Sequence, residues 1–564
     1  MSNNLKFKLF LLVFFTMVLF PNILNVNAEE LKTPIHIVFE MHSHEDDIIR
    51  AAGGTGFFED HKDVFLTQLE SVEWLLDKVD EFGAKISFLS VGPWAELCLD
   101  ESLQEQCFPL IQRLYDSGEM IGTHSHNYRF MGSFNQWDAD RKDSTGRNNW
   151  QYVNFVNLLI ENALGVSDED EISEINLAGG FTKPKNTILK HQLLKDNNFQ
   201  IKQGGEEQVF LLYYNHLPFN PFRVGDASGL SEDLEEGLFT IPQYPIFNSK
   251  IRAGAAVDSS LGHQKAMFLQ VLLNWRDSDE PKIWTYGWGT HVHNIVEEPD
   301  TRERIDNMLT WLSANFIDKK SNGSVIAQYY NYKQVLNDYE NWEDEHPGVS
   351  SFEYNLDHTD YSEYPYNKWV NHYLRNSIVV DDLILEKKTK AFLLESNESP
   401  LILAFSDNSK TDLNFEDYFS KNVRIISLQD GTFDLADPSS IVIGSDAVVI
   451  CLPMDCKKIL DDDTGLTLSE VSSLKKIPSG VKENAKLWAN DEINNKTFVK
   501  SITSLIKEKI IVLPFSSDPV KTPIDEIFPL WFKDLAGWWG DDLVNDDKFV
   551  VVLQYLINHG IIKL

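Results

Sequence analysis

The first half of the chain alternates short apolar runs with longer amphipathic stretches. Residues 34–39, 85–91 and 282–286 have the short apolar pattern of buried strands. Residues 107–116 and 301–316 instead have a helix-like pattern. In α/β folds and barrels with parallel strands, the carboxyl ends of the strands converge on one pocket.

Histidine-rich clusters follow the probable strands at three places. Six of the 15 histidines of the chain fall in these short segments, and residues 40–47 also contain four carboxylates. Imidazole is a common ligand of zinc, so the clusters predict a convergent metal site, whereas the alternative is three solvated loops. The pairs are His42 with His44, His124 with His126, and His291 with His293.

Five short segments between residues 33 and 340 resemble the motifs of a known protein family and follow one another in the same order. They are residues 86–92, 118–124, 181–186 with the helix-like residues 193–199 behind them, 237–242 and 288–293. Together they resemble the polysaccharide deacetylases with a NodB-type domain, including the Gly-His-Glu-Ile-Gly-Asn-His signature and the later Leu-His-Asp motif. The resemblance implies a distorted (β/α) barrel over residues 29–340 and the removal of acetyl groups from N-acetylated amino sugars of a polysaccharide.

The residue types in the clusters indicate a role for each residue. Glu45 is the expected general base, and His291 or His293 is expected to protonate the leaving amine. Aromatic residues such as Tyr213, Tyr214 and Trp288 either stack on sugar rings or belong to the core. The expected ligands of a divalent metal ion, zinc by preference, are Asp46, His124 and His126, with His42 as a fourth ligand or as a partner of the ligands.

Three motif positions of that family are altered in this chain. Its opening Asp-Asp pair is represented by residues 44–46, which follow the strand at a later position. Tyr128 stands where the second metal histidine is expected, so His126 is the nearest substitute. Residues 182–183 replace the arginine of the third motif.

Two other functions fit these altered motifs. One is a catalytically inactive carbohydrate-binding or cell-envelope protein that retains the barrel. The other is a glycoside hydrolase, because residues 39–46 also resemble the His-x-His opening of some barrel sugar hydrolases. A glycosidase of this kind needs two carboxylates about 5–10 Å apart across a cleft, with no metal between them.

The beginning of the chain and its cysteines predict a secreted protein. Residues 1–28 have the basic, apolar and small-residue parts of a signal peptide, and no later segment is long and apolar enough to span a membrane. Cys98 with Cys107 and Cys451 with Cys456 predict two local disulfides. The net charge of -36 argues against a nucleic acid partner and against an anionic membrane surface.

The length of 564 residues predicts further domains after the barrel. Residues 341–376 have the composition of a linker. Residues 377–455 contain short β-type runs separated by turn residues, which predict a small β-sandwich-like module.

An internal repeat with a period of 51 residues occupies residues 474–564, as copies 474–513 and 525–564. Each copy has the pattern of two helices, so the tail is predicted to be an all-helical tandem repeat. Trp488 and Trp539 hold equivalent places, as do Phe498 and Phe549. The second copy resembles a tail module of secreted archaeal proteins, and its expected role is surface attachment, self-association or stabilisation.

Overall fold

A computed structural model describes most of the chain, and several predicted residues lie outside the part it describes. The predicted signal peptide, His44, Glu45, Asp46 and His126 are among them. The described residues are 31–43, 62–125, 128–130, 137–142, 149–179, 187–203, 219–225, 232–241, 260–278, 281–297, 299–349, 351, 368–374, 377–386, 388–396, 399–407, 409–456, 479–490, 492–507, 530–540 and 549.

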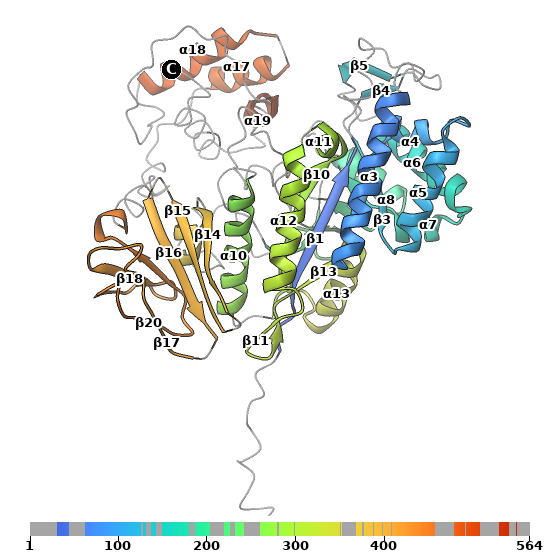
Figure 1. The fold of residues 1–564 in the computed structure, drawn as a ribbon. Helices are drawn as coiled ribbons and strands as arrows, with labels where there is room; N and C mark the ends of the chain where they lie inside the picture. The colour runs from blue at the N-terminus through green and yellow to red at the C-terminus, as the bar shows by residue number, and fades with distance from the viewer. Residues whose placement is uncertain are drawn as a thin grey trace, which may run out of the picture.

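A curled sheet of mostly parallel strands forms the first part of the structure, in the manner of a distorted barrel (Figure 1). Among the described strands of this sheet, β8 alone runs antiparallel to its neighbour, and β13 (Ala327–Tyr330) pairs with β1 beside the main path. The strands in spatial order are β10 (Thr285–His291), β1 (Ile35–His42), β2 (Ser87–Val91), β3 (Met120–His124), β6 (Ala178–Gly179), β7 (Ile201–Gln203), β9 (Leu238–Ile241) and β8 (Phe222–Val224).

Helices cover the convex face of this sheet. Strand β1 is buried on both faces, and its residues Ile37, Phe39 and Met41 join the large core beneath these helices. The helices of this part are α3 (Lys62–Phe82), α4 (Gly92–Cys98), α5 (Gln104–Asp116), α6 (Asn149–Leu164), α7 (Glu169–Ile175), α8 (Thr187–Asp196), α10 (Leu261–Asp277), α11 (Val292–Glu297) and α12 (Pro299–Asn315).

The concave face holds a second apolar cluster at the amino ends of the strands. Side chains on a strand alternate between the two faces, so Val38 points opposite to Ile37 and Phe39. Helix α13 (Tyr332–Glu345) packs Val335 and Leu336 into this cluster. The Asn331 amide donates to the Gly118 carbonyl at 2.6 Å, which ties the start of α13 to the residues before β3. The amino end of the barrel is therefore filled.

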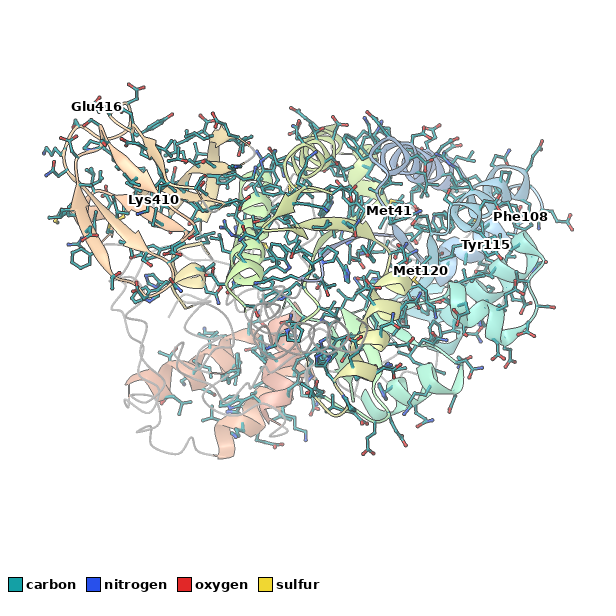
Figure 2. The ribbon with its side chains drawn as sticks, turned by 90° about the horizontal axis from the view of Figure 1, so that it is seen from below. Met41, Phe108, Tyr115, Met120, Lys410 and Glu416 are labelled. Carbon is teal, nitrogen blue, oxygen red and sulfur yellow. A yellow bond between two sulfur atoms is a disulfide. The ribbon has the colours of Figure 1, made fainter. Side chains whose placement is uncertain are left out.

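The second β region is an antiparallel sheet with a smaller sheet beside it. The six-stranded sheet consists of β14 (Ser377–Leu385), β15 (Thr389–Ser396), β16 (Ser399–Ser406), β21 (Val448–Cys451), β18 (Val423–Ser427) and β19 (Phe433–Ala436). The smaller sheet consists of β17 (Thr411–Leu413) and β20 (Ile441–Ile443). In the view of Figure 2, Lys410 and Glu416 of this region lie on the opposite side of the molecule from Phe108 and Tyr115 of α5.

The six-stranded sheet packs directly on the barrel. Phe392 and Leu403 on one of its faces belong to the same core as the barrel helices, and the Phe392 ring lies 6.3 Å from that of Trp311 on α12. Lys265 of α10 forms a 2.8 Å ion pair with Asp382 of β14. One continuous core therefore joins the barrel and the sheet.

Three helices are described in the tail: α17 (Ser479–Ala489), α18 (Asn495–Lys507) and α19 (Leu530–Gly540). The Trp488 ring stacks on Phe498 at 4.0 Å, and the Trp539 ring stacks on Phe549 at 3.7 Å. Within the described part of the chain, no helix combines the length and apolar character that crossing a membrane requires.

Both predicted disulfides are present. Cys98 is bonded to Cys107 with a Cα–Cα distance of 5.5 Å, and Cys451 to Cys456 with 5.7 Å. Each closes a loop within one region of the chain, so neither links the barrel to the sheet. The contact between these two regions depends on the shared core instead.

We expect Phe392→Ala to lower the free energy of unfolding by ~3–5 kcal/mol, because it removes a fully buried ring from that core. Urea unfolding followed by circular dichroism should show one transition at a lower midpoint. Phe433→Ala in the same sheet is the control, because its ring is 55% exposed and its loss should change little. A variant in which the sheet unfolds in a separate, earlier transition would contradict the continuous core.

Candidate functional site

Three imidazoles meet at the carboxyl ends of three barrel strands. His42, His124 and His291 are the last residues of β1, β3 and β10. The His42 ring lies 4.3 Å from that of His124, in a stacked arrangement, and 4.3 Å from that of His291, edge to face. All three residues are buried. The structure therefore brings together one histidine from each of the three predicted clusters.

The strands extend further than the apolar runs alone predict. The pattern places the end of the first strand at residue 39, but parallel pairing of β1 with β10 continues to His42 opposite His291. Backbone hydrogen bonds continue this ladder beyond the strand ends. The Ser43 N–H donates to the Leu89 carbonyl at 3.0 Å, and the Ser125 N–H donates to the Gly179 carbonyl at 3.0 Å. These bonds fix the backbone on which His42 and His124 sit.

A buried carboxylate lies directly beneath the histidines. Glu40 precedes His42 by two residues, so its side chain points to the same face of the strand. Its Oε1 lies 3.5 Å from the Nδ1 of His42, and its Oε2 accepts a hydrogen bond from the side-chain amide of Gln203 on β7. Because Gln203 comes from the far side of the curled sheet, this bond crosses the barrel interior. Glu40 thus lies beside the Nδ1 atom of the His42 ring.

Two glycines leave room for the side chains of Glu40, Gln203 and His124. A Cβ atom on Gly289 would lie 2.7 Å from Oε1 of Glu40. A Cβ atom on Gly179 would lie 2.5 Å from Oε1 of Gln203 and 3.1 Å from Nδ1 of His124. Larger residues at either position would therefore displace Glu40, Gln203 or His124.

The remaining predicted residues divide into those that join the site and those that do not. His293 lies in the first turn of α11, and its ring stacks on His291 at 5.0 Å. Trp288, a candidate for sugar stacking, is 1% exposed and packs on Phe39 in the core. Glu45, Asp46 and His126 lie outside the described residues and stay predictions. Tyr213 and Tyr214 do so as well.

The histidines fit a metal ion by residue type and by position, while their ring orientations do not converge on one. Three imidazoles with a carboxylate behind one of them form a donor set that suits zinc. Within the part of the chain that the structure describes, however, no three candidate ligands point at a common centre. The rings of His42 and His124 differ by only 19°, and two nearly parallel rings cannot both direct an in-plane lone pair at one ion ~2.0–2.1 Å away. Binding would require one ring to rotate.

The sequence pattern assigns neither a catalytic nor a metal-binding role to Glu40 or Gln203. Glu40 does carry a signal, because it is a charged residue at an inward position of an otherwise apolar strand. Gln203 carries none, since its pairing with Glu40 joins residues 163 positions apart in the sequence. Only the curl of the sheet places them together.

Comparisons with known proteins return distant structural similarities. No family model and no curated protein matches the chain. One similar solved structure is a probable polysaccharide deacetylase from Pseudomonas aeruginosa PAO1, with 10% identity and a TM-score of 0.35, covering 56% of this chain and 93% of that one. Another is the Puue allantoinase, with 9% identity and a TM-score of 0.36, covering 56% of this chain and 92% of that one.

We expect Gly289→Ala to lower the free energy of unfolding by ~1–3 kcal/mol, because the added methyl group would press on the Glu40 carboxylate. Gly444→Ala is the matched control, since a Cβ atom there meets nothing within 4 Å. Chemical denaturation of both variants and the parent measures the difference. Equal stability of the two variants would show that the space beside Glu40 is not restricted.

Proposed function

We propose that the protein is a secreted, metal-dependent hydrolase that removes acetyl groups from the N-acetylated amino sugars of a polysaccharide. The observation that carries the proposal is the meeting of His42, His124 and His291 at the carboxyl edge of one parallel sheet. In barrels and open α/β sheets this edge is where ligands bind and where reactions take place. The resemblance of the serial motifs to polysaccharide deacetylases supplies the reaction class.

The histidines are the proposed centre of a divalent metal site. His42 and His124 would supply imidazole nitrogens, and Asp46 and His126 would complete the ligand set from the segments that follow β1 and β3. When bound, zinc would polarise an amide carbonyl and lower the pKa of a water molecule. Glu40, held by Gln203, would fix the orientation of the His42 ring, as carboxylates do for ligating histidines elsewhere.

The other residues of the site would handle protons. Glu45 is the proposed general base, because it neighbours the carboxylate ligand and belongs to the segment that leaves β1. His291 is proposed to protonate the leaving amine, since its ring lies beside that of His42 at the end of β10. The His293 ring stacked on His291 would restrict the positions of this acid.

A second candidate function is supported by the stacking of His42 on His124. A barrel that keeps its histidines without a converged metal site would bind carbohydrate and catalyse nothing. The altered motifs at residues 44–46 and 182–183 agree with this alternative. Metal content of the purified protein separates the two candidates, because the binding protein needs no metal.

Export of the protein is supported by two independent features. Residues 1–28 have the pattern of a signal peptide, and both cysteine pairs form disulfides, which persist in oxidising compartments. The net charge of -36 also suits a cationic, partly deacetylated polymer as a partner.

We propose further that the tail is a tandem repeat whose two copies pack against each other about a pseudo-twofold axis. Contacts in the tail occur in reciprocal pairs at the 51-residue spacing. Lys482 lies over the Trp539 ring at 5.9 Å, and its equivalent Lys533 lies over the Trp488 ring at 5.6 Å. A Cβ atom on Gly537 would meet Ala489, and one on Gly540 would meet Lys486, which is the reciprocal pair. Two such self-complementary halves would stabilise each other as the subunits of a dimer do.

We expect His124→Ala and His42→Ala to lose bound zinc and the release of acetate from N-acetylglucosamine oligomers. Glu45→Gln should instead keep the metal and lose roughly 10²–10⁴-fold in rate, the contribution of a general base. Elemental analysis and an acetate assay measure the two effects separately.

His346→Ala is the matched control, since that ring stacks on Trp342 of α13, at the other end of the barrel. It should keep both the metal and the rate. Zinc retained at full occupancy in His124→Ala would contradict the proposed site. If His42→Ala empties the site and Asp46→Asn does not, the carboxylate ligand is wrongly assigned.

We expect Trp539→Ala to unfold the tail and to leave metal content and acetate release unchanged. Losing a fully buried indole costs ~3–5 kcal/mol, a large fraction of the stability of so small a unit. Hydrogen exchange should rise across α17, α18 and α19 together, because each copy supports the other. Gly480→Ala is the control, since nothing lies within 4 Å of its added Cβ atom. Exchange that rises in α19 alone would contradict the paired repeat.

A further inference from the structure

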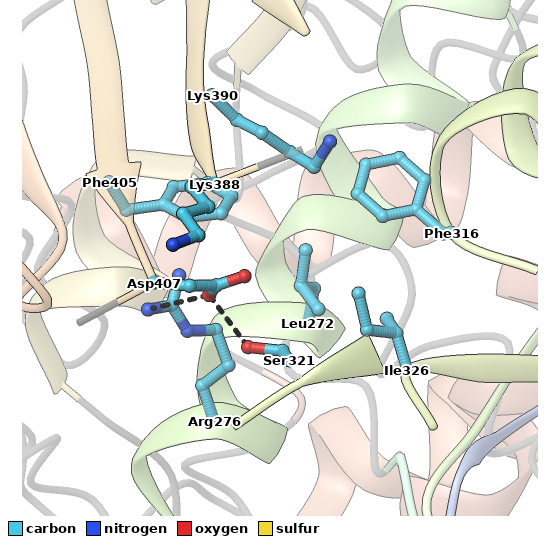
Figure 3. Close-up of a pocket in the computed structure, with 9 residues that line it drawn as sticks. All are labelled: Leu272, Arg276, Phe316, Ser321, Ile326, Lys388, Lys390, Phe405 and Asp407. Atoms are coloured by element: carbon cyan, nitrogen blue, oxygen red, sulfur yellow. Dashed lines mark hydrogen bonds and ion pairs between the residues drawn. The ribbon is translucent and has the colours of Figure 1, made fainter. Parts of the chain in front are cut away.

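A small cavity lies where the barrel meets the six-stranded sheet (Figure 3). Its volume is about 10 Å³, which is space for one water-sized particle. Arg276 of α10 contributes from the barrel, and Lys388, Lys390 and Asp407 contribute from the sheet. The cavity therefore lies inside the contact on which the continuous core depends.

Arg276 is buried with one nitrogen unsatisfied. Its side chain is 10% exposed, and the guanidinium lies over the Phe405 ring at 4.6 Å. Nη2 donates to the Ser445 carbonyl at 3.0 Å and lies 3.8 Å from Oδ1 of Asp407. Nη1 is buried and has no hydrogen-bond partner among the residues that the structure describes. A buried donor on a charged group requires a partner, because its desolvation is otherwise uncompensated.

The other charged groups leave the cavity with an excess of positive charge. Three cations line it against one carboxylate, and that carboxylate also accepts a 2.7 Å hydrogen bond from the Ser321 hydroxyl. Burial lowers the pKa of Arg276 even though Asp277, Asp407 and Asp446 act in the opposite direction. Burial lowers the pKa of Lys390 as well. The carboxylates nearby are therefore insufficient to offset the burial of these cations.

The walls and the size of the cavity restrict which anion could compensate the excess positive charge. Phe316 and Phe405 make part of the wall apolar, and the Lys390 ammonium lies over the Phe316 ring at 5.2 Å. A carboxylate, phosphate or sulfate has several heavy atoms and exceeds this space. A monatomic anion accepts hydrogen bonds from any direction and tolerates apolar neighbours.

We propose that this cavity binds one halide ion, chloride in a physiological medium, held by the Arg276 guanidinium with the ammonium groups of Lys388 and Lys390. The ion would connect α10 of the barrel to β15 and β16 of the sheet. The stability of the contact between the two regions would therefore depend on the chloride concentration. The site is separate from the histidines and does not depend on the proposed hydrolase activity.

Thermal unfolding of the full chain in sodium chloride and in sodium gluconate, at equal ionic strength, tests the site. Gluconate is too large for the cavity. We expect a saturable rise in Tm with chloride, on the order of 1–2 °C, and none with gluconate. Crystals of the same protein grown in sodium bromide should show one anomalous peak between Arg276 and Lys390.

Variants assign the effect to this cavity. Arg276→Met and Lys390→Met should each remove the chloride dependence and the bromide peak. Arg223→Met is the matched control, since the Arg223 side chain is also largely buried but donates to both oxygens of Glu343. That variant should be less stable and should keep the full response to chloride.

Two results would overturn the halide site. One is an equal Tm in chloride and gluconate together with crystals in which the cavity holds no bromide. The other is a chloride response that persists unchanged in Lys390→Met. Should Arg276→Met fail to fold, the bromide experiment on the parent protein and the Lys390 variant still decide the question.

Discussion

The parallel alignment of β1 with β10 is the constraint on which the histidine site depends. Their register pairs His42 with His291 and Glu40 with Gly289, so the polar residues of both strands lie at matching heights. Through β2, the same alignment reaches His124 on β3. A slip of one residue would turn every side chain of β1 to the opposite face. The carboxylate and the imidazole would then enter the apolar core, whereas Phe39 and Met41 would enter the site.

Much of this arrangement could be predicted from the sequence, because apolar runs and the histidines that follow them are local signals. The α/β fold class and both disulfides are confirmed, and one histidine from each cluster lies at the same edge of the sheet. The strand ends were placed too early, since Glu40 and His42 are strand residues only through their pairing with β10 and β2. The bond between Gln203 and Glu40 and the packing of Phe392 on Trp311 depend on curvature and contact across the fold, which no local pattern carries.

The six-stranded sheet covers one side of the barrel helices and shares their hydrophobic core. Alternation along β15 sends Ala391 toward β17 and β20, while Phe392 packs toward the barrel helices. The cations near this contact, Arg276, Lys388 and Lys390, stand out in a chain that carries 86 acidic and 50 basic residues. Arg276 and Lys390 place buried positive charge at this contact, although the net charge of the chain is -36.

The position of β1 in the sheet has a consequence for how the chain acquires its structure. β1 is formed near the beginning of the sequence, yet two of its partners, β10 and β13, come from residues 285–291 and 327–330. The edge of this apolar strand that pairs with β10, and the part of the other edge that pairs with β13, stay unpaired until those residues have been synthesised. Contacts between residues so distant in sequence slow the search for the native state and prolong the exposure of aggregation-prone segments. A nascent chain of this protein therefore needs protection of its first strand for most of the time that its barrel takes to be made.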